Sequence, residues 1–417
     1  MSQSEELYKR SQKVIPWGTQ TNSKRPDESL AGIMPYYIER GDGCRIQDVD
    51  GDWYIDYRSA LGPILLGYRH RRVDDAVRRQ MEKGVLFSMA SPLETEVAEQ
   101  LTGMIPGLEQ VRFMKTGHEA NLAALRLARA YTRRDMIATC GYHGHSDWFV
   151  CGAGEEMSPW PRENNGVPRA LDSLVTRIPY GDIAAAERII GEFGEQLAAV
   201  IMVPYDWNEN VAGEFVERVR GLTQEYGIML IFDQILTGFR LATAGAQEYF
   251  GVIPDLTTYA KALANGYPLS VFGGRAALMN QLNENVVITI THGGETLSLA
   301  AANEVLNILQ DEPVVRHIWS MGERLQEGFN QAAEDLGLQA RTIGLPPSVQ
   351  FRFSSNRETD QEARELFFRE LYQQKIFASL PFLISYAHQQ EDIDQTVEAI
   401  RNVLPRVAET YPSLEKT

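Results

Sequence analysis

The feature that most constrains the fold of this chain is a pair of short, almost wholly apolar runs. Residues 198–203 (AAVIMV) and 228–232 (IMLIF) contain no charged side chain. Apolar runs without polar alternation are typical of strands buried on both faces, as in a parallel sheet. Helical patterns lie between such runs, so the sequence predicts a doubly wound α/β core.

Helix signals flank these runs. Ser91 to Glu94 has the pattern of a capping box with proline at the first helical position. Residues 117–131 are expected to form a helix with a small apolar face that packs closely on the sheet. That face comprises Ala120, Ala123, Ala124, Leu127, Ala128 and Tyr131. A long helix is expected after Pro313, with Gly337 at its end, and residues 286–290 are expected to form a strand.

Composition narrows the class of protein. The 417 residues exceed one ordinary core and suggest two domains. The net charge of −16, from 40 basic and 56 acidic residues, disfavours nucleic acid and anionic membrane as partners. No run is long and apolar enough to span a membrane. Three cysteines suit a reducing compartment, so the sequence predicts a cytoplasmic enzyme that acts on small molecules.

Two residues near the expected strand ends could carry chemistry. Asp233 follows the apolar run 228–232, where ligands bind in open α/β sheets. A carboxylate there needs a cation or a donor, such as a protonated pyridine nitrogen, although a helix cap or a solvated strand end is the alternative. Lys261 lies in an apolar, hydroxyl-rich stretch that would favour a neutral, nucleophilic amine. The alternative for Lys261 is a lysine extending to solvent from a helix face.

Three further segments are weaker signals. Thr116, Gly117 and His118 come between an expected strand and a helix, which favours anion binding, although a plain connection has the same pattern. Thr291 starts a glycine-containing turn before another helix, with the same two interpretations. Tyr142 could stack on an aromatic cofactor. A zinc site of Cys140, His143, His145 and Cys151 competes with that reading, but the spacing does not fit paired metal ligands, so we expect no metal.

Taken together, these segments resemble the class III aminotransferases of pyridoxal 5′-phosphate (PLP) fold type I. The resemblance runs from about Gly41 to Leu404 and includes a glutamate-1-semialdehyde 2,1-aminomutase-like pattern. It rests on residues 142–145 (YHGH), 230–240 (LIFDQILTGFR), 254–261 (PDLTTYAK) and 272–275 (FGGR).

The resemblance implies a large domain, with a mostly parallel sheet sandwiched by helices, and a smaller α+β domain. The expected boundaries are an N-terminal segment of residues 1–60 that packs with the small domain and active site, a large PLP-binding domain of 61–310 and a small domain of 311–417. Homodimers with active sites at the interface are also implied.

The resemblance also implies a role for each candidate site residue. Lys261 would bind PLP covalently and move a proton, and Asp233 would keep the pyridine nitrogen protonated. Tyr142 would stack on the ring, and Thr116, Gly117 and His118 would contact the phosphate. Thr291 would reach the phosphate of a neighbouring subunit. His118 departs from the family, which usually has a small hydroxyl residue there, and Gln234 stands where the family commonly has Glu.

The predicted reaction is transfer of an amino group from a donor to an aldehyde or ketone through pyridoxamine phosphate. Two alternatives use the same scaffold. One is an intramolecular glutamate-1-semialdehyde 2,1-aminomutase-type reaction, and the other is sugar aminotransfer, suggested by residues 19–26 (TQTNSKRP), 62–67 (GPILLG) and 293–299 (GGETLSL). A nicotinamide oxidoreductase is disfavoured because the chain lacks a G-x-G-x-x-G turn after a strand.

Overall fold

The structure is a computed structural model that describes residues 2–27, 30–151, 166–206, 213–378 and 380–414. Its contacts divide the chain into two units. Unit 1 comprises the chain up to His70 and from Arg316 onward, and unit 2 comprises Arg71–Asp206 and the chain from Asn210 to Val315. The domain boundaries expected near residues 60 and 310 stay a prediction.

Unit 2 is built on a seven-stranded sheet with the order β4-β10-β9-β8-β7-β5-β6. All neighbouring pairs are parallel except those of β10, which runs antiparallel to both β4 and β9. The strands are β4 (Gln110–Met114), β5 (Met136–Cys140), β6 (Val175–Arg177), β7 (Leu197–Met202), β8 (Met229–Asp233), β9 (Leu256–Tyr259) and β10 (Ser270–Gly274). The mostly parallel sheet that the apolar runs predict is confirmed.

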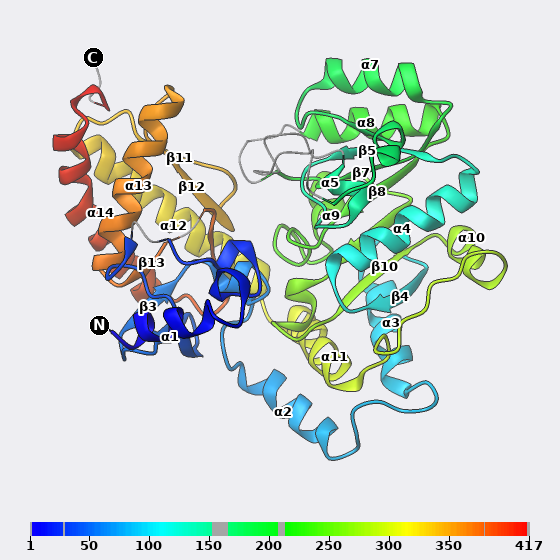
Figure 1. Ribbon diagram of the computed structural model, residues 1–417, viewed down its shortest axis with the longest axis horizontal. Coiled ribbons are helices and arrows are strands. Elements are labelled where there is room, and N and C mark those ends of the chain that lie inside the picture. Colours follow the sequence, from blue (N-terminus) through cyan, green and yellow to red (C-terminus); the bar gives the residue numbers. More distant parts are fainter. Residues whose placement is uncertain (1, 28–29, 152–165, 207–212, 379, 415–417) are drawn as a thin grey trace. The chain divides into compact units, whose positions relative to one another are not determined.

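Helices cover both faces of this sheet, because successive strand residues point to opposite sides. Along β7, Val200 packs in one hydrophobic cluster with α7 and α8, whereas Ile201 packs in another with α4. Figure 1 shows α7 and α8 side by side next to β5, β7 and β8, with α4 on the other side. The helices of unit 2 are α2 (Arg71–Met81), α3 (Pro92–Met104), α4 (Gly117–Thr132), α5 (Asp147–Val150), α7 (Ile183–Phe193), α8 (Gly213–Glu225), α9 (Ala246–Phe250), α10 (Ala276–Met279) and α11 (Thr296–Asp311).

Unit 1 combines two small sheets with long helices, as expected for an α+β domain. One sheet has the order β1-β2-β3-β13 and the other β11-β12-β14. Its strands are β1 (Ile38–Asp42), β2 (Arg45–Asp48), β3 (Trp53–Asp56), β11 (Arg341–Ile343), β12 (Ser348–Arg352), β13 (Ile376–Phe377) and β14 (Phe382–Leu383). Its helices are α1 (Gln3–Ser11), most of α12 (Val314–Asp335), α13 (Arg357–Gln373) and α14 (Gln390–Thr410).

Local sequence signals determine several helix ends. The capping box at Ser91 starts α3, where the Glu94 carboxylate accepts a hydrogen bond from the Ser91 N–H at 2.8 Å. The helix after Pro313 is α12, and Gly337 adopts a positive φ of 67° just beyond its end. Glycine tolerates this left-handed conformation at little cost, which explains its place there.

Two details of the expected fold are wrong. Residues 286–290 form no strand. Val286 and Ile288 are buried in the core, whereas Val287 between them is 74% exposed. The alternation that suggested a strand therefore reflects side-chain anchoring without backbone pairing. Tyr131 does not belong to the buried face of α4 either. It lies in the last turn of that helix and is 42% exposed.

Candidate functional site

The carboxylate of Asp233 is the centre of a buried polar group at the carboxyl end of β8. One oxygen, Oδ2, lies 2.8 Å from Asn121 Nδ2 and 2.8 Å from His143 Nδ1. The other, Oδ1, accepts a hydrogen bond from the N–H of Ile235 at 3.1 Å. Because Asp233 is only 4% exposed, these donors replace the water that a buried carboxylate loses. Among the described residues, Oδ1 has only the Ile235 N–H as a donor and so retains acceptor capacity, which lets a further N–H donor bind there.

Asn121 is fixed at both ends of its amide. Its Oδ1 accepts a hydrogen bond from Thr258 Oγ1 at 2.8 Å, while Nδ2 also donates to the carbonyl of His143 at 3.2 Å. The sequence interpretation missed this residue. Asn121 lies one helical turn after Gly117, on the same face of α4, and a buried amide among alanines was the signal that could have identified it.

Lys261 begins the short 3₁₀ turn η7 (Lys261–Ala264), which follows β9. Its φ of 45° lies in the left-handed region, an unusual conformation for a residue with a side chain. Burial lowers the pKa of the Lys261 ammonium to about 8, the Asp233 carboxylate opposes this shift and the Arg240 guanidinium adds to it. The amine is therefore partly neutral near pH 8, which a nucleophile requires.

Arg240 is the fully buried cation of this region. Its side chain is 0% exposed, and burial lowers its pKa to about 10. Its backbone N–H donates to the carbonyl of Thr237 at 3.2 Å, within the turn that follows β8. Its charge reaches Lys261, so the segment 230–240 contributes both a carboxylate and a guanidinium to the surroundings of that amine.

The N-terminus of α4 forms the second part of the site. A Cβ on Gly117 would lie 2.5 Å from Ile235 Cδ1, so a larger residue there would require the Ile235 side chain to shift. Thr116 is held by its carbonyl, which accepts a hydrogen bond from Ser270 Oγ at 2.7 Å. Next to it, His118 Nδ1 lies 3.0 Å from Thr116 Oγ1. The free backbone N–H groups of this first turn favour an anion.

Tyr142 and Thr291 are both exposed to solvent, unlike Asp233. Tyr142 is 61% exposed and packs edge-on against Phe149, with ring centroids 5.4 Å apart. Partial burial and the negative charge of Asp233 both raise the pKa of the Tyr142 phenol. Thr291 is exposed, and no hydrogen bond joins it to Asp233, Lys261 or Thr116 within the described residues. The structure thus brings the expected site residues together except Thr291.

The competing zinc site is not assembled. Cys140 packs in the hydrophobic cluster of α7 and α8, whereas Cys151 packs in the cluster of α4. His143 contacts Asp233 and His145 contacts His118. In the part of the chain that the structure describes, no three His, Cys, Asp or Glu residues form a group able to hold a metal. All three cysteines are buried, and none forms a disulfide within the described residues.

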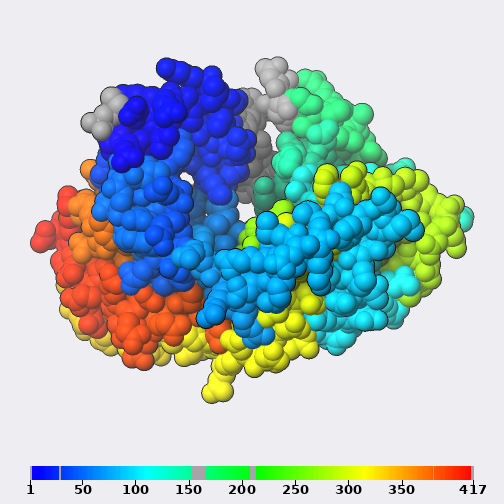
Figure 2. Space-filling model, turned by 90° about the horizontal axis from the view of Figure 1, so that it is seen from below, coloured from blue at the N-terminus to red at the C-terminus, as the bar shows by residue number. Residues whose placement is uncertain are grey.

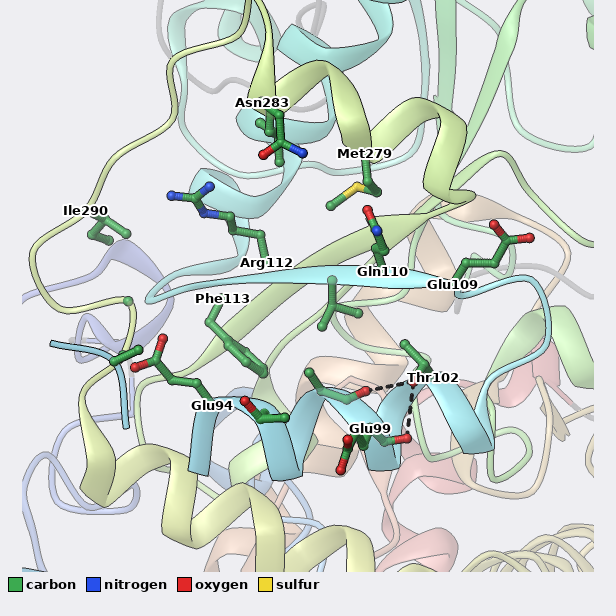
Figure 3. A pocket seen from close by; sticks show the side chains of 17 residues that line it. Glu94, Glu99, Thr102, Glu109, Gln110, Arg112, Phe113, Met279, Asn283 and Ile290 are labelled. Atoms are coloured by element: carbon green, nitrogen blue, oxygen red, sulfur yellow. Dashed lines mark hydrogen bonds between the residues drawn. The ribbon is translucent and has the colours of Figure 1, made fainter. Parts of the chain in front are cut away.

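A cavity of about 720 Å³ lies elsewhere in unit 2, between α3, β4 and the segment 279–294. Figure 3 shows Glu94, Glu99 and Thr102 extending from α3 on one side, with Arg112 and Asn283 on the other side of β4. Its lining includes Gly293 and Gly294, close in sequence to Thr291. The cavity therefore borders the Thr291 turn and does not include Lys261 or Asp233.

Known proteins are similar to this chain over nearly its whole length. The family model of class III aminotransferases matches residues 29–404. The glutamate-1-semialdehyde 2,1-aminomutase of Sulfurihydrogenibium azorense is 35% identical over 95% of this chain and 97% of its own length. That of Aquifex aeolicus is 33% identical over 96% and 99%, respectively.

Among solved structures, an omega-transaminase from Sphaerobacter thermophilus superposes with a TM-score of 0.88 at 26% identity, over 97% of this chain and 98% of that one. The FumI protein of Sphingopyxis sp. MTA144, solved in its PLP internal aldimine form, has the same TM-score and identity and covers 99% and 98%. Within the described residues, none of the helices is both long and apolar enough to cross a bilayer.

Proposed function

Since the chain belongs to the class III aminotransferase family of PLP-dependent enzymes, we propose that it transfers an amino group from a small-molecule donor to an aldehyde or ketone. The observation that carries the proposal is the grouping of Lys261, with its lowered pKa, and the buried Asp233 carboxylate in one electrostatic network.

The residues of the site fit PLP by their chemistry. Asp233 retains acceptor capacity for the pyridinium N–H, while Asn121 and His143 hold it in place. We propose that Lys261 binds the cofactor covalently and that Tyr142 stacks on its ring. Thr116, Gly117 and His118 offer the first turn of α4 to the phosphate. When bound, PLP carries the amino group and withdraws electrons from the substrate carbon.

The protein contributes proton transfer and charge to this chemistry. An amine with a pKa of about 8 exchanges protons readily near neutral pH, so Lys261 can move the proton at the substrate carbon through Nζ. Asp233 holds the proton on the ring nitrogen because a buried anion stabilises an adjacent cation. Asn121 and His143 act through Asp233 by fixing its orientation.

A second function is favoured by the relatives. Proteins named glutamate-1-semialdehyde 2,1-aminomutase match nearly the whole chain at 35% identity. Such an enzyme moves the amino group within one molecule, whereas an aminotransferase moves it between two. The two functions share every residue assigned above and differ in whether a second substrate is required.

One experiment separates the two. The PLP-loaded protein receives glutamate-1-semialdehyde alone, and separately an amino donor with or without a keto or aldehyde acceptor. We expect conversion of the donor to stop at one equivalent per active site until an acceptor is added. Many turnovers of glutamate-1-semialdehyde without a second substrate would establish the aminomutase instead. The Lys261→Ala variant serves as the inactive control in both assays.

A homodimer is part of the proposal. Exposed apolar side chains lie at the end of α2 and just after it: Met81, Val85, Leu86, Phe87 and Met89 are each at least 40% exposed. Figure 2 shows this light blue segment on the surface of unit 2. A patch of this kind favours contact with a second copy, and Thr291, exposed on its turn, would then be available to the phosphate of the partner. Sedimentation equilibrium tests the dimer. The cytoplasmic location stays a prediction.

A further inference from the structure

His118 places an imidazole in the first turn of α4, at the position where anions bind helices. It is the second residue of that helix, and its Nδ1 lies 3.0 Å from Thr116 Oγ1. The imidazole of His145 lies against it, with ring centroids 4.2 Å apart and ring planes tilted by 53°. Two histidines from separate segments therefore meet at this helix end.

A glycine fixes this meeting. Gly144 has a φ of 107°, and a Cβ there would lie 2.6 Å from His118 Cβ. The backbone of the loop before His145 thus packs directly on His118, which leaves the imidazole little freedom to turn away. Any larger residue at this position would clash with His118 Cβ.

The charges around His118 are few and already engaged. Glu119 accepts hydrogen bonds from the N–H and hydroxyl of Thr116, both at 2.8 Å. The ammonium of Lys115 is paired with Glu295 at 2.9 Å. Burial, followed by the neighbouring His145, lowers the pKa of His118, and Glu119 opposes this shift. Without an anion, His118 is therefore mainly neutral at pH 7, since the ordinary pKa of histidine is about 6.5.

Resting on the proposed function, which puts the cofactor phosphate at this helix end, we propose that the His118 side chain binds that phosphate and takes up one proton from solvent on binding. An anion beside an imidazole stabilises its protonated form. The complex then holds more protons than the free protein, so affinity rises as pH falls through the range between the two His118 pKa values. Above that range the effect is lost.

The test uses pyridoxine 5′-phosphate, which has no aldehyde and cannot link to a lysine. All measurements are made in the Lys261→Ala background, so that this amine does not titrate. Calorimetry in two buffers of different ionisation enthalpy gives the number of protons taken up at pH 7. Affinity is measured between pH 6.5 and 8.5, above the phosphate pKa of about 6.

We expect the protein with His118 to take up about half a proton more than His118→Gln, and to gain roughly three- to tenfold in affinity from pH 8.5 to 6.5. Pyridoxine, which lacks the phosphate, should show no difference between the two proteins. Equal uptake by His118→Gln, or loss of uptake only in His145→Gln, would overturn the proposal. Tight but pH-independent binding would overturn it too, while leaving the proposed function intact. No binding of the phosphate compound at any pH, together with no PLP uptake by the unaltered chain, would refute both.

Discussion

The two ends of the site differ in how completely the chain supplies their partners. At the end of β8, Asp233 is 4% exposed and contacts an amide, an imidazole and a backbone N–H. At the start of α4, Thr116 is exposed and His118 only partly buried, and the first N–H groups of the helix have no intrahelical partner. The Asp233 carboxylate is held by three donors from the chain, whereas the start of α4 offers N–H groups to an anion.

This difference predicts where substitutions act. Changes at the Asp233 end should alter chemistry, because they disturb a charge that is fixed before any ligand arrives. Changes at the α4 end should alter cofactor affinity, because the interactions there form only on binding.

Replacing Lys261 should have the largest effect. We expect Lys261→Ala to lower turnover by about 10³-fold or more, since both the covalent link and proton transfer are lost. Steady-state assays with the PLP-loaded protein measure this loss. Lys13→Ala, which removes an exposed lysine, should be unchanged. Equal activity of the two variants would contradict the assignment.

The pH dependence of PLP capture tests the same amine. Burial lowers the pKa of Lys261 to about 8, and only the neutral amine attacks an aldehyde. The rate of covalent PLP uptake should therefore rise by roughly two orders of magnitude from pH 6 to 9 and level off above that. Stopped-flow absorbance measures the rate. A profile that keeps rising to pH 10.5 would indicate an ordinary exposed lysine.

Removing the charge of Asp233 should have the next largest effect on turnover. Asp233→Asn preserves shape but leaves the ring nitrogen without an anion, so we expect turnover to fall by about 10²-fold while PLP is still bound. The absorbance spectrum reports bound cofactor independently of turnover. A variant that keeps full activity would show that Asp233 has only a structural role.

Replacing Asn121, which holds the Asp233 carboxylate in position, should lower turnover less than replacing Asp233 itself. Asn121→Ala removes one hydrogen bond to a charged group, worth about 1.5–3 kcal/mol, so turnover should fall roughly 10- to 100-fold. Asn121→Asp should be worse, because it places a second carboxylate beside the first. If both variants equal the original chain in turnover, the two ends of the site do not differ as described.

Tyr142 should give the smallest change. An aromatic pair contributes about 0.5–1.5 kcal/mol, so Tyr142→Ala should weaken PLP binding by roughly two- to tenfold, and Tyr142→Phe should not. Fluorescence titration of the apoprotein measures both. An equal loss in Tyr142→Phe and Tyr142→Ala would assign the effect to the hydroxyl group and not to the ring.

The sequence predicted the position of Asp233 better than it predicted the residues that contact Asp233. The apolar run of β8 placed Asp233 at a strand end, and the capping box placed the start of α3, because both depend on local patterns. Asn121 and His143 were not assigned to Asp233, since their contacts join residues more than 85 positions apart. The strand predicted at residues 286–290 is wrong for the same reason. Alternating burial was real, but whether a strand partner exists depends on distant parts of the chain.

Peptide mapping after reduction tests directly whether Lys261 is the amine that binds PLP. The protein is incubated with PLP, reduced with borohydride and digested, and the modified lysine is located by mass spectrometry. We predict one modification per chain, on the peptide that contains Lys261. A modification on any other lysine, or a protein that takes up no PLP at saturating concentration, would contradict the account.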